Sequence, residues 1–205
     1  MGHTRLPKRD CELVQIVDVA LAEAARKSGA WLVCKPGCTQ CCYGPFPISQ
    51  LDAARLRRGL EDLGSRDPQR AARVKSRAVE SLQRLSAGFT GDVETGILAE
   101  DERSVELFDG FANEEPCPAL DLETGTCDLY ESRPMTCRTF GPPIRSGPEE
   151  GLGVCELCYH GATATQIAAC EMVPDPDGLE ARLIKEIERS SGLAGNTIVA
   201  FTLAK

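Results

Sequence analysis

Four cysteines lie within nine residues, two of them adjacent, in the run Cys34-Lys35-Pro36-Gly37-Cys38-Thr39-Gln40-Cys41-Cys42. After a long insert, a second group follows that comprises Cys117, Cys127, Cys137, Cys155 and Cys158. Thiolate sulfur is a soft ligand, and four thiolates can surround one zinc or iron ion or hold an iron–sulfur cluster. Clustered thiols of this kind predict a metal centre, and we expect the fold to bring the two groups together.

The number of thiols permits either one centre or two. Successive side chains project in different directions, so we do not expect Cys41 and Cys42 to bind one ion together easily. This favours two centres, or one centre with a spare thiol. The residues Cys155 and Cys158 form a CxxC pair, a spacing at which two thiolates chelate one ion. The candidate metal ligands are therefore Cys34, Cys38, Cys41, Cys42, Cys117, Cys127, Cys137, Cys155 and Cys158.

Three further residues of ligand type are not in this set. Cys11 begins a predicted helix and has no second thiol at motif spacing, so we expect it to be a small buried hydrophobic residue. Cys170 is expected to face the core from another helix. His160 follows the CxxC pair by two residues. With nine thiols available, we expect His160 to lie at the surface or in a hydrogen bond rather than to bind metal.

Buried thiolates need a source of positive charge. Four thiolates on a divalent ion leave two excess negative charges, which are costly to bury. Arg133 and Arg138 flank Cys137 in the sequence and are able to offset that charge. In the alternative interpretation, both arginines pair with Glu131 and Asp128 at the surface. The sequence leaves both interpretations open.

Composition narrows the class of protein. The chain has 205 residues, of which 42% are hydrophobic, so it can bury a core without relying on metal alone. Its net charge of −8 argues against a nucleic-acid binder that neutralises phosphates. No apolar stretch approaches the roughly 20 residues that cross a bilayer, and the opening residues 1–10 are polar. The sequence thus predicts a cytoplasmic protein with no membrane partner, whose 11 cysteines stay reduced rather than forming disulfides.

Helical periodicity surrounds the cysteine-rich segments. Apolar spacing, capping residues and glycine stops predict helices at about 11–27, 49–63, 67–88, 135–138, 162–172 and 179–189. The segment 117–130 carries a hairpin signal, with Gly125 near the turn, which would place Cys117 and Cys127 on facing strands. The residues 31–33 are either a short strand or a buried lead-in to the cluster, and 104–108 are either a strand or a helical turn. The tail 195–205 is expected to dock as a last apolar segment.

These elements predict a mainly α fold with a small β-hairpin, in which helices flank an irregular cysteine-rich metal-binding core. An N-terminal helix occupies 1–30, and the metal-chelating domain occupies 31–160 with a helical insert at about 49–113. A helical extension follows at 161–205.

The segments that carry the cysteines resemble a known family. Residues 34–42, 117–120 and 127–140 are together similar to the YkgJ-type cysteine-cluster family, whose CxxCxxCC domain is described as zinc- or iron-chelating; the resemblance covers about Val33 to Cys158. It implies a metal-chelating cysteine cluster in a cytoplasmic bacterial protein of unassigned biochemical role. Here three residues, rather than two, separate Cys34 from Cys38. Flagellin lysine N-methylase, a larger protein, resembles a relative of this family. That resemblance implies an iron–sulfur centre.

The leading hypothesis is a metal-chelating protein that binds zinc or iron, whether as single ions or in an iron–sulfur cluster. A second hypothesis is an iron–sulfur-dependent enzyme that modifies a protein side chain. The spacing Cys34-x3-Cys38-x2-Cys41 matches that of radical S-adenosylmethionine enzymes, although no α/β barrel pattern follows it. The third hypothesis is a zinc-stabilised interaction module. Its contact surface would be an arginine stripe at 66, 70, 73, 77 and 84, which is otherwise a solvated face balanced by nearby acids.

Overall fold

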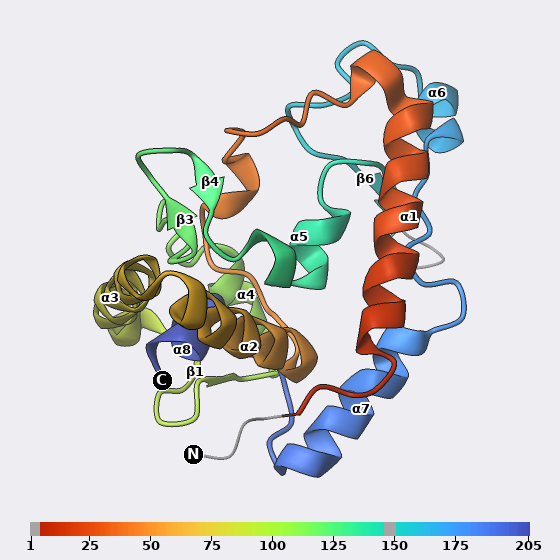
Figure 1. Ribbon diagram of the computed structural model, residues 1–205. Coiled ribbons are helices and arrows are strands. Elements are labelled where there is room, and N and C mark those ends of the chain that lie inside the picture. Colours follow the sequence, from red (N-terminus) through yellow and green to blue (C-terminus); the bar gives the residue numbers. More distant parts are fainter. Residues whose placement is uncertain (1–4, 146–150) are drawn as a thin grey trace. The chain divides into compact units, whose positions relative to one another are not determined.

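The computed structural model describes residues 5–145 and 151–205, and helices account for most of its regular structure (Figure 1). The helices are α1 (Asp10–Ser28), α2 (Gln50–Arg66), α3 (Pro68–Leu85), α4 (Glu102–Asp109), α5 (Met135–Thr139), α6 (Ala164–Ala169), α7 (Leu179–Ser191) and α8 (Val199–Ala204). The strands form three antiparallel pairs, which are β1 (Gly91–Asp92) with β2 (Ile97–Leu98), β3 (Leu120–Asp121) with β4 (Thr126–Cys127), and β5 (Ile144–Arg145) with β6 (Leu152–Gly153). Within the described residues, every helix is too short or too polar to cross a bilayer.

The predicted fold class is confirmed, because the fold is mainly α with small hairpins. Only the β3–β4 hairpin was expected from the sequence. The β1–β2 and β5–β6 pairs are two residues per strand, which is too short to give an alternating pattern that sequence reading can detect. The ambiguous stretch 104–108 is helical and belongs to α4, whose first turn is capped by the Asp101 side chain accepting from the Ser104 amide at 3.1 Å.

The described residues form two compact units. Unit 1 contains Gly37–Pro134 and Ile184–Lys205, with Arg5 and Leu6. Unit 2 contains Pro7–Pro36 and Met135–Leu183. Each unit therefore holds members of both cysteine groups, and the borders between the units do not fall between the groups.

Unit 1 is built on α2, α3 and α8, which pack against one another (Figure 1). Both long helices begin where the sequence predicts, because the side chains of Ser49 and Asp67 accept hydrogen bonds from the amides of Asp52 and Arg70. The C-terminal tail docks as expected, but as a helix in the core. The aliphatic core that these elements share comprises Ile48, Ala53, Leu56, Leu60, Leu63, Ala71, Val74, Ala78, Ala119, Leu129, Val199 and Leu203.

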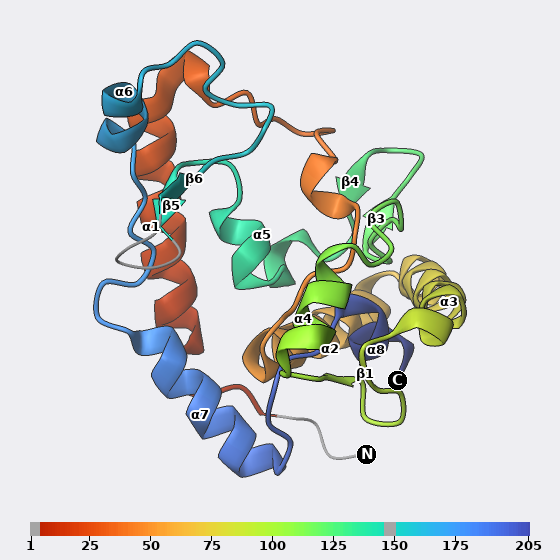
Figure 2. The same cartoon turned by 180° about the vertical axis from the view of Figure 1, so that it is seen from behind.

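Unit 2 is built on α1, α5, α6 and the β5–β6 hairpin (Figure 2). Helix α5 packs on α1, where the buried Arg138 guanidinium pairs with Asp18 at 2.8 Å. Residues 31–33 do not form a strand, since a 3₁₀ turn over Gly29–Trp31 leads into irregular chain. Helix α6 is shorter than predicted. It begins at a capping box between Thr163 and Gln166 and ends before Cys170.

Candidate metal centre

Five of the nine candidate ligands lie in unit 1, and a backbone hydrogen bond joins the two cysteine groups there. Cys41 and Cys42 are in a 3₁₀ turn over Gln40–Cys42. The Cys117 amide donates to the Cys42 carbonyl at 2.7 Å, and an isolated bridge between Tyr43 and Pro116 extends this pairing. The chain segments that carry the early and the late cysteines therefore run side by side.

The β3–β4 hairpin brings two more thiols to the same place. Cys127 lies on β4 in register with Leu120, while Cys117 comes just before β3 rather than on it, as its carbonyl accepts from the Leu120 amide at 2.9 Å. The hairpin tip is Gly125, with φ +67°, where a Cβ would lie 3.4 Å from the Gly37 Cα. This close approach sets the tip against the loop that carries Cys38, the fifth thiol of unit 1. We name Cys38, Cys41, Cys42, Cys117 and Cys127 the unit 1 thiol cluster.

The adjacent cysteines share a hydrogen bond, which differs from the expectation that their side chains diverge. This bond from the Cys42 thiol, together with the more distant positive charge of Arg133, lowers the pKa of Cys41 to about 7. The same bond, burial and the nearby sulfurs of Cys117 and Cys127 raise the pKa of Cys42. Adjacency alone therefore does not prevent the two sulfurs from serving one ion.

The hairpin thiols are poorly solvated. Burial raises the pKa of the Cys117 thiol to about 12 and also raises that of Cys127. Both are therefore protonated at neutral pH until a cation displaces the proton. Among residues 5–145 and 151–205, no three histidine, cysteine, aspartate or glutamate side chains are already arranged to hold one ion. The five donors are nevertheless all thiol sulfurs, a soft set that fits zinc or iron. Binding would draw these sulfurs together.

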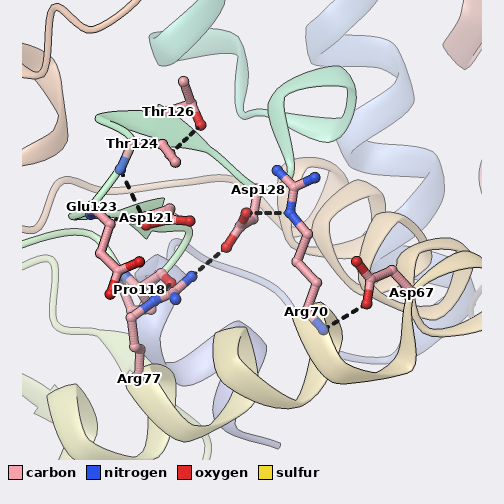
Figure 3. A network of polar contacts seen from close by, with 9 residues as sticks. All are labelled: Asp67, Arg70, Arg77, Pro118, Asp121, Glu123, Thr124, Thr126 and Asp128. Atoms are coloured by element: carbon pink, nitrogen blue, oxygen red, sulfur yellow. Dashed lines mark hydrogen bonds and ion pairs between the residues drawn. The ribbon is translucent and has the colours of Figure 1, made fainter.

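An ion-pair network fixes the hairpin to α3 (Figure 3). The carboxylate of Asp128, next to Cys127, is 1% exposed and pairs with Arg70 and Arg77, each at 2.5 Å. Arg77 also donates from Nε to the Pro118 carbonyl at 2.9 Å, one residue after Cys117. Both thiol-bearing ends of the hairpin are thereby tied to one helix. We name Asp128, Arg70 and Arg77 the hairpin clamp.

The arginine stripe is balanced within unit 1. Besides the two arginines of the hairpin clamp, Arg84 forms a bidentate ion pair with Glu115, with nitrogen–oxygen distances of 2.8 and 3.0 Å. Arg66 donates to the Asp62 carbonyl in its own helix. The interpretation of this face as one balanced by nearby acids is therefore supported, and three of its five guanidiniums have carboxylate partners.

The two arginines that flank Cys137 differ in their surroundings. The carboxylate of Asp128 pairs with Arg70 and Arg77 of the hairpin clamp rather than with either of these arginines. Arg138 pairs with Asp18 in unit 2. Arg133 is buried, stacks over the Tyr130 ring at 3.9 Å and lies close enough to Cys41 and Cys127 to favour their thiolates. Arg133 is thus a cationic neighbour of the unit 1 thiol cluster.

Unit 2 contains the other four candidate ligands. Cys34 is exposed, Cys137 on α5 is half-buried, and Cys155 and Cys158 are buried. His160 is exposed, which agrees with the prediction of a surface histidine. The prediction for Cys11 is wrong, because its side chain is exposed. It precedes the buried Leu13 by two residues, which places it about 200° away around the helix.

Cys170 is buried, as expected, but sequence reasoning did not predict which residues surround it. This thiol follows α6 directly and is buried in one cluster with Cys155, Cys158 and Tyr159, rather than against the core of its own helix. It lies 12 positions after Cys158, outside the CxxC motif itself.

Comparison with protein families matches residues 33–158 to the CxxCxxCC family, described as a putative zinc- or iron-chelating domain. The matched segment includes all nine candidate ligands and ends at Cys158, so Cys170 lies outside it. Searches of curated proteins and of solved structures gave no significant match.

Proposed function

The chain belongs to the CxxCxxCC family of zinc- or iron-chelating domains, and from this premise we propose that unit 1 binds one zinc or iron ion through its thiol cluster. Cys41, Cys42, Cys117 and Cys127 supply four sulfurs, and Cys38 is the spare thiol or an exchangeable fifth. The observation that carries the proposal is the Cys42–Cys117 backbone pairing, which joins two segments far apart in the chain at their cysteines. A hydrophobic core alone does not require cysteines at this junction.

Proton release accompanies binding. Cys42 and Cys117 have raised pKa values, so each gives its proton to solvent as its sulfur meets the cation. Cys41 is already half ionised at neutral pH because its pKa is about 7, and it is therefore the sulfur that captures the ion first. Arg133 offsets part of the negative charge that four thiolates leave behind. An ion held by four sulfurs would stabilise the loop and the hairpin, as zinc does in structural sites.

The hairpin clamp supports the site mechanically. A metal site needs ligands held at about 2.3 Å from the ion, so the backbone behind each sulfur must be fixed. Two arginines on the Asp128 carboxylate hold β4, and the Arg77 bond to the Pro118 carbonyl holds the segment before β3. The long helix α3 thereby acts as a rigid base for two of the sulfurs.

The remaining candidate ligands are Cys34, Cys137, Cys155 and Cys158. All four lie in unit 2, and their role as ligands remains a prediction from the sequence. The segment between Cys34 and Cys38 is one residue longer than in the family motif. The border between the units falls within this segment, after Pro36. Cys38-x2-Cys41-Cys42 is the part of the motif that lies in unit 1.

The test is metal quantification on protein purified without oxygen, together with its ultraviolet–visible spectrum. We expect zinc or iron in the wild type and one ion fewer per chain in the Cys42→Ser/Cys117→Ser variant. The matched control is Cys11→Ser, an exposed thiol outside both clusters, which should keep the wild-type metal content. Equal metal content in the double variant and the control, with both chains folded by circular dichroism, would contradict the proposal. A colourless zinc protein would also exclude the iron–sulfur enzyme.

A further inference from the structure

Unit 2 has a buried cluster whose composition is unusual for a hydrophobic core. Its fully buried members are Cys155, Cys158, Tyr159 and Cys170, each 4–5% exposed. In the core of unit 1, by contrast, the buried residues are alanine, valine, leucine and isoleucine. A thiol buries less apolar area than a leucine side chain, so three thiols contribute less hydrophobic free energy to folding. Such a cluster implies another source of stability.

The backbone around the CxxC pair is shaped for chelation. The Cys158 amide donates to the Cys155 carbonyl at 2.9 Å, which closes a tight turn over the pair. Tyr159, the next residue, has φ +60°, in the left-handed region that only a few per cent of non-glycine residues occupy. Its amide donates to the Trp31 carbonyl at 2.9 Å, which holds the turn against the segment that leads to Cys34.

The hydroxyl of Tyr159 supplies a buried polar contact among the sulfurs. It lies within hydrogen-bonding reach of the Ser28 hydroxyl and of the Cys170 side chain. Ser28 is 1% exposed and bonds the Ala24 carbonyl at 2.6 Å, so the chain of contacts ends in α1. The phenol has one proton to share between these two neighbours, and its contacts hold the Cys170 side chain in place beside the other sulfurs.

A fourth sulfur approaches this cluster through Gly141. The Cys155 amide is 3.5 Å from the Gly141 carbonyl. A Cβ on Gly141 would lie 3.1 Å from the Cys34 Sγ and 3.2 Å from Leu32, which itself packs on the cluster. Gly141 has φ +120°, so a side chain is disfavoured there for both backbone and steric reasons. Cys34 and Cys155 are therefore neighbours of the same small residue.

We propose that unit 2 contains a second metal site for a thiophilic divalent cation of the zinc class, formed by Cys155, Cys158 and Cys170 with Cys34 as the fourth ligand. Binding exchanges four S–H protons for four metal–sulfur bonds, so one cation enters, four protons leave to solvent, and the local charge becomes two units negative. The ion would have to draw the sulfurs together, because no three ligand side chains in the described segments are already arranged around one point. This site is independent of the unit 1 thiol cluster, and Cys170, outside the matched family segment, is its diagnostic ligand.

Cobalt(II) is the probe, because a tetrahedral thiolate environment gives it characteristic visible and charge-transfer absorption. The full chain is reduced, freed of metal and titrated without oxygen as the Cys42→Ser/Cys117→Ser variant, in which the unit 1 cluster is disabled. We expect one thiolate-bound cobalt per chain. Adding Cys170→Ser should weaken its binding at least about tenfold, while adding Cys11→Ser should leave it unchanged. Equal binding in the Cys170→Ser and Cys11→Ser backgrounds would overturn the proposal.

A second measurement on the wild-type chain covers the case in which a variant does not fold. The rate of alkylation of each cysteine is measured by mass spectrometry, with and without zinc. We expect zinc to slow the modification of Cys170 and Cys158 at least about tenfold, while the rate at Cys11 stays the same. If zinc slows modification of Cys42 and Cys117 but not of Cys170, the proposed function of unit 1 stands and the second site is wrong. If it slows Cys170 but not Cys42, the second site stands alone.

Discussion

The two thiol clusters of this protein are supported in different ways. In unit 1, the cysteines lie at the margin of an aliphatic core, and Cys117 and Cys127 are only partly buried against it. The hairpin clamp adds a buried carboxylate with two guanidinium partners. In unit 2, the thiols are themselves most of the buried cluster. We therefore expect unit 1 to be a preformed scaffold for its thiol cluster, and the thiol-rich part of unit 2 to depend on a bound ligand for its stability.

Removal of metal should have the largest effect on local stability, and this effect should differ between the two units. A ligand at 1,000 times its dissociation constant stabilises the state that binds it by about 4 kcal/mol. After chelation we expect amide hydrogen exchange to accelerate strongly around Tyr159 and Cys170. Exchange at Leu56 and Val74, in the core of α2 and α3, should change little. Equal acceleration in both places would show that the two clusters do not differ in their dependence on metal.

The Asp128→Ala substitution should have the next largest effect, and it acts on unit 1 alone. It leaves Arg70 and Arg77 without the buried carboxylate, so we expect a loss of about 3 kcal/mol in the free energy of unfolding and weaker metal binding. The matched control is Asp62→Ala, which removes an exposed pair with Arg58 and should cost less than about 1 kcal/mol. Denaturant unfolding measures both. A cost for Asp128→Ala no greater than the control would show that the clamp does not hold the hairpin.

Alkaline pH should weaken metal-free unit 1. The folded state raises the pKa of Cys117 from an ordinary value of 9.0 to about 12, so above pH 9 the unfolded chain loses its proton first. At this group the folded state then binds more protons, so the contribution of Cys117 to stability falls as pH rises, by about 1 kcal/mol at pH 10. The fall should be shallower in the Cys42→Ala/Cys117→Ala variant. Thermal unfolding between pH 8 and pH 10 measures the slopes, and identical slopes would contradict the assignment.

The smallest effect concerns the reactivity of Cys41. Its pKa of about 7 depends chiefly on the hydrogen bond from Cys42 and to a lesser degree on Arg133. At pH 7, Cys42→Ala should therefore slow alkylation of Cys41 more than Arg133→Met does, and Arg133→Met should slow it a few-fold. Arg103→Met, at an exposed arginine of α4 in the same unit, is the control. An unchanged rate in Cys42→Ala would refute the role of the hydrogen bond.

Local features of the fold could be predicted from the sequence. The helices α1, α2, α3 and α5 begin and end close to their expected positions, because capping residues such as Ser49 and Asp67 act within one turn. The hairpin at Gly125 was expected for the same reason. The convergence of Cys42 and Cys117 was expected only as a consequence of metal binding, and the backbone bond that produces it has no local signal.

The features that the sequence did not predict depend on which residues far apart in the chain come into contact. The acids and arginines in and around the hairpin allow many pairings, and only the packing of α3 selects Asp128 as the partner of Arg70 and Arg77. The exposure of Cys11 depends likewise on which face of α1 meets its neighbours, and the burial of Cys170 depends on how the turn after α6 packs. The short strands β1, β2, β5 and β6 follow from their surroundings rather than from their own residues.

The most direct test of a metal site in the unit 1 thiol cluster is X-ray absorption at the metal edge. The sample is the Cys155→Ser/Cys158→Ser/Cys170→Ser variant, loaded without oxygen, in which the thiols of unit 1 are intact. We predict a coordination shell of four sulfur atoms at about 2.3 Å from a zinc or iron ion. That shell should be lost in the same background when Cys42 and Cys117 are also replaced by serine. A shell of nitrogen and oxygen atoms alone in the first sample would contradict the account.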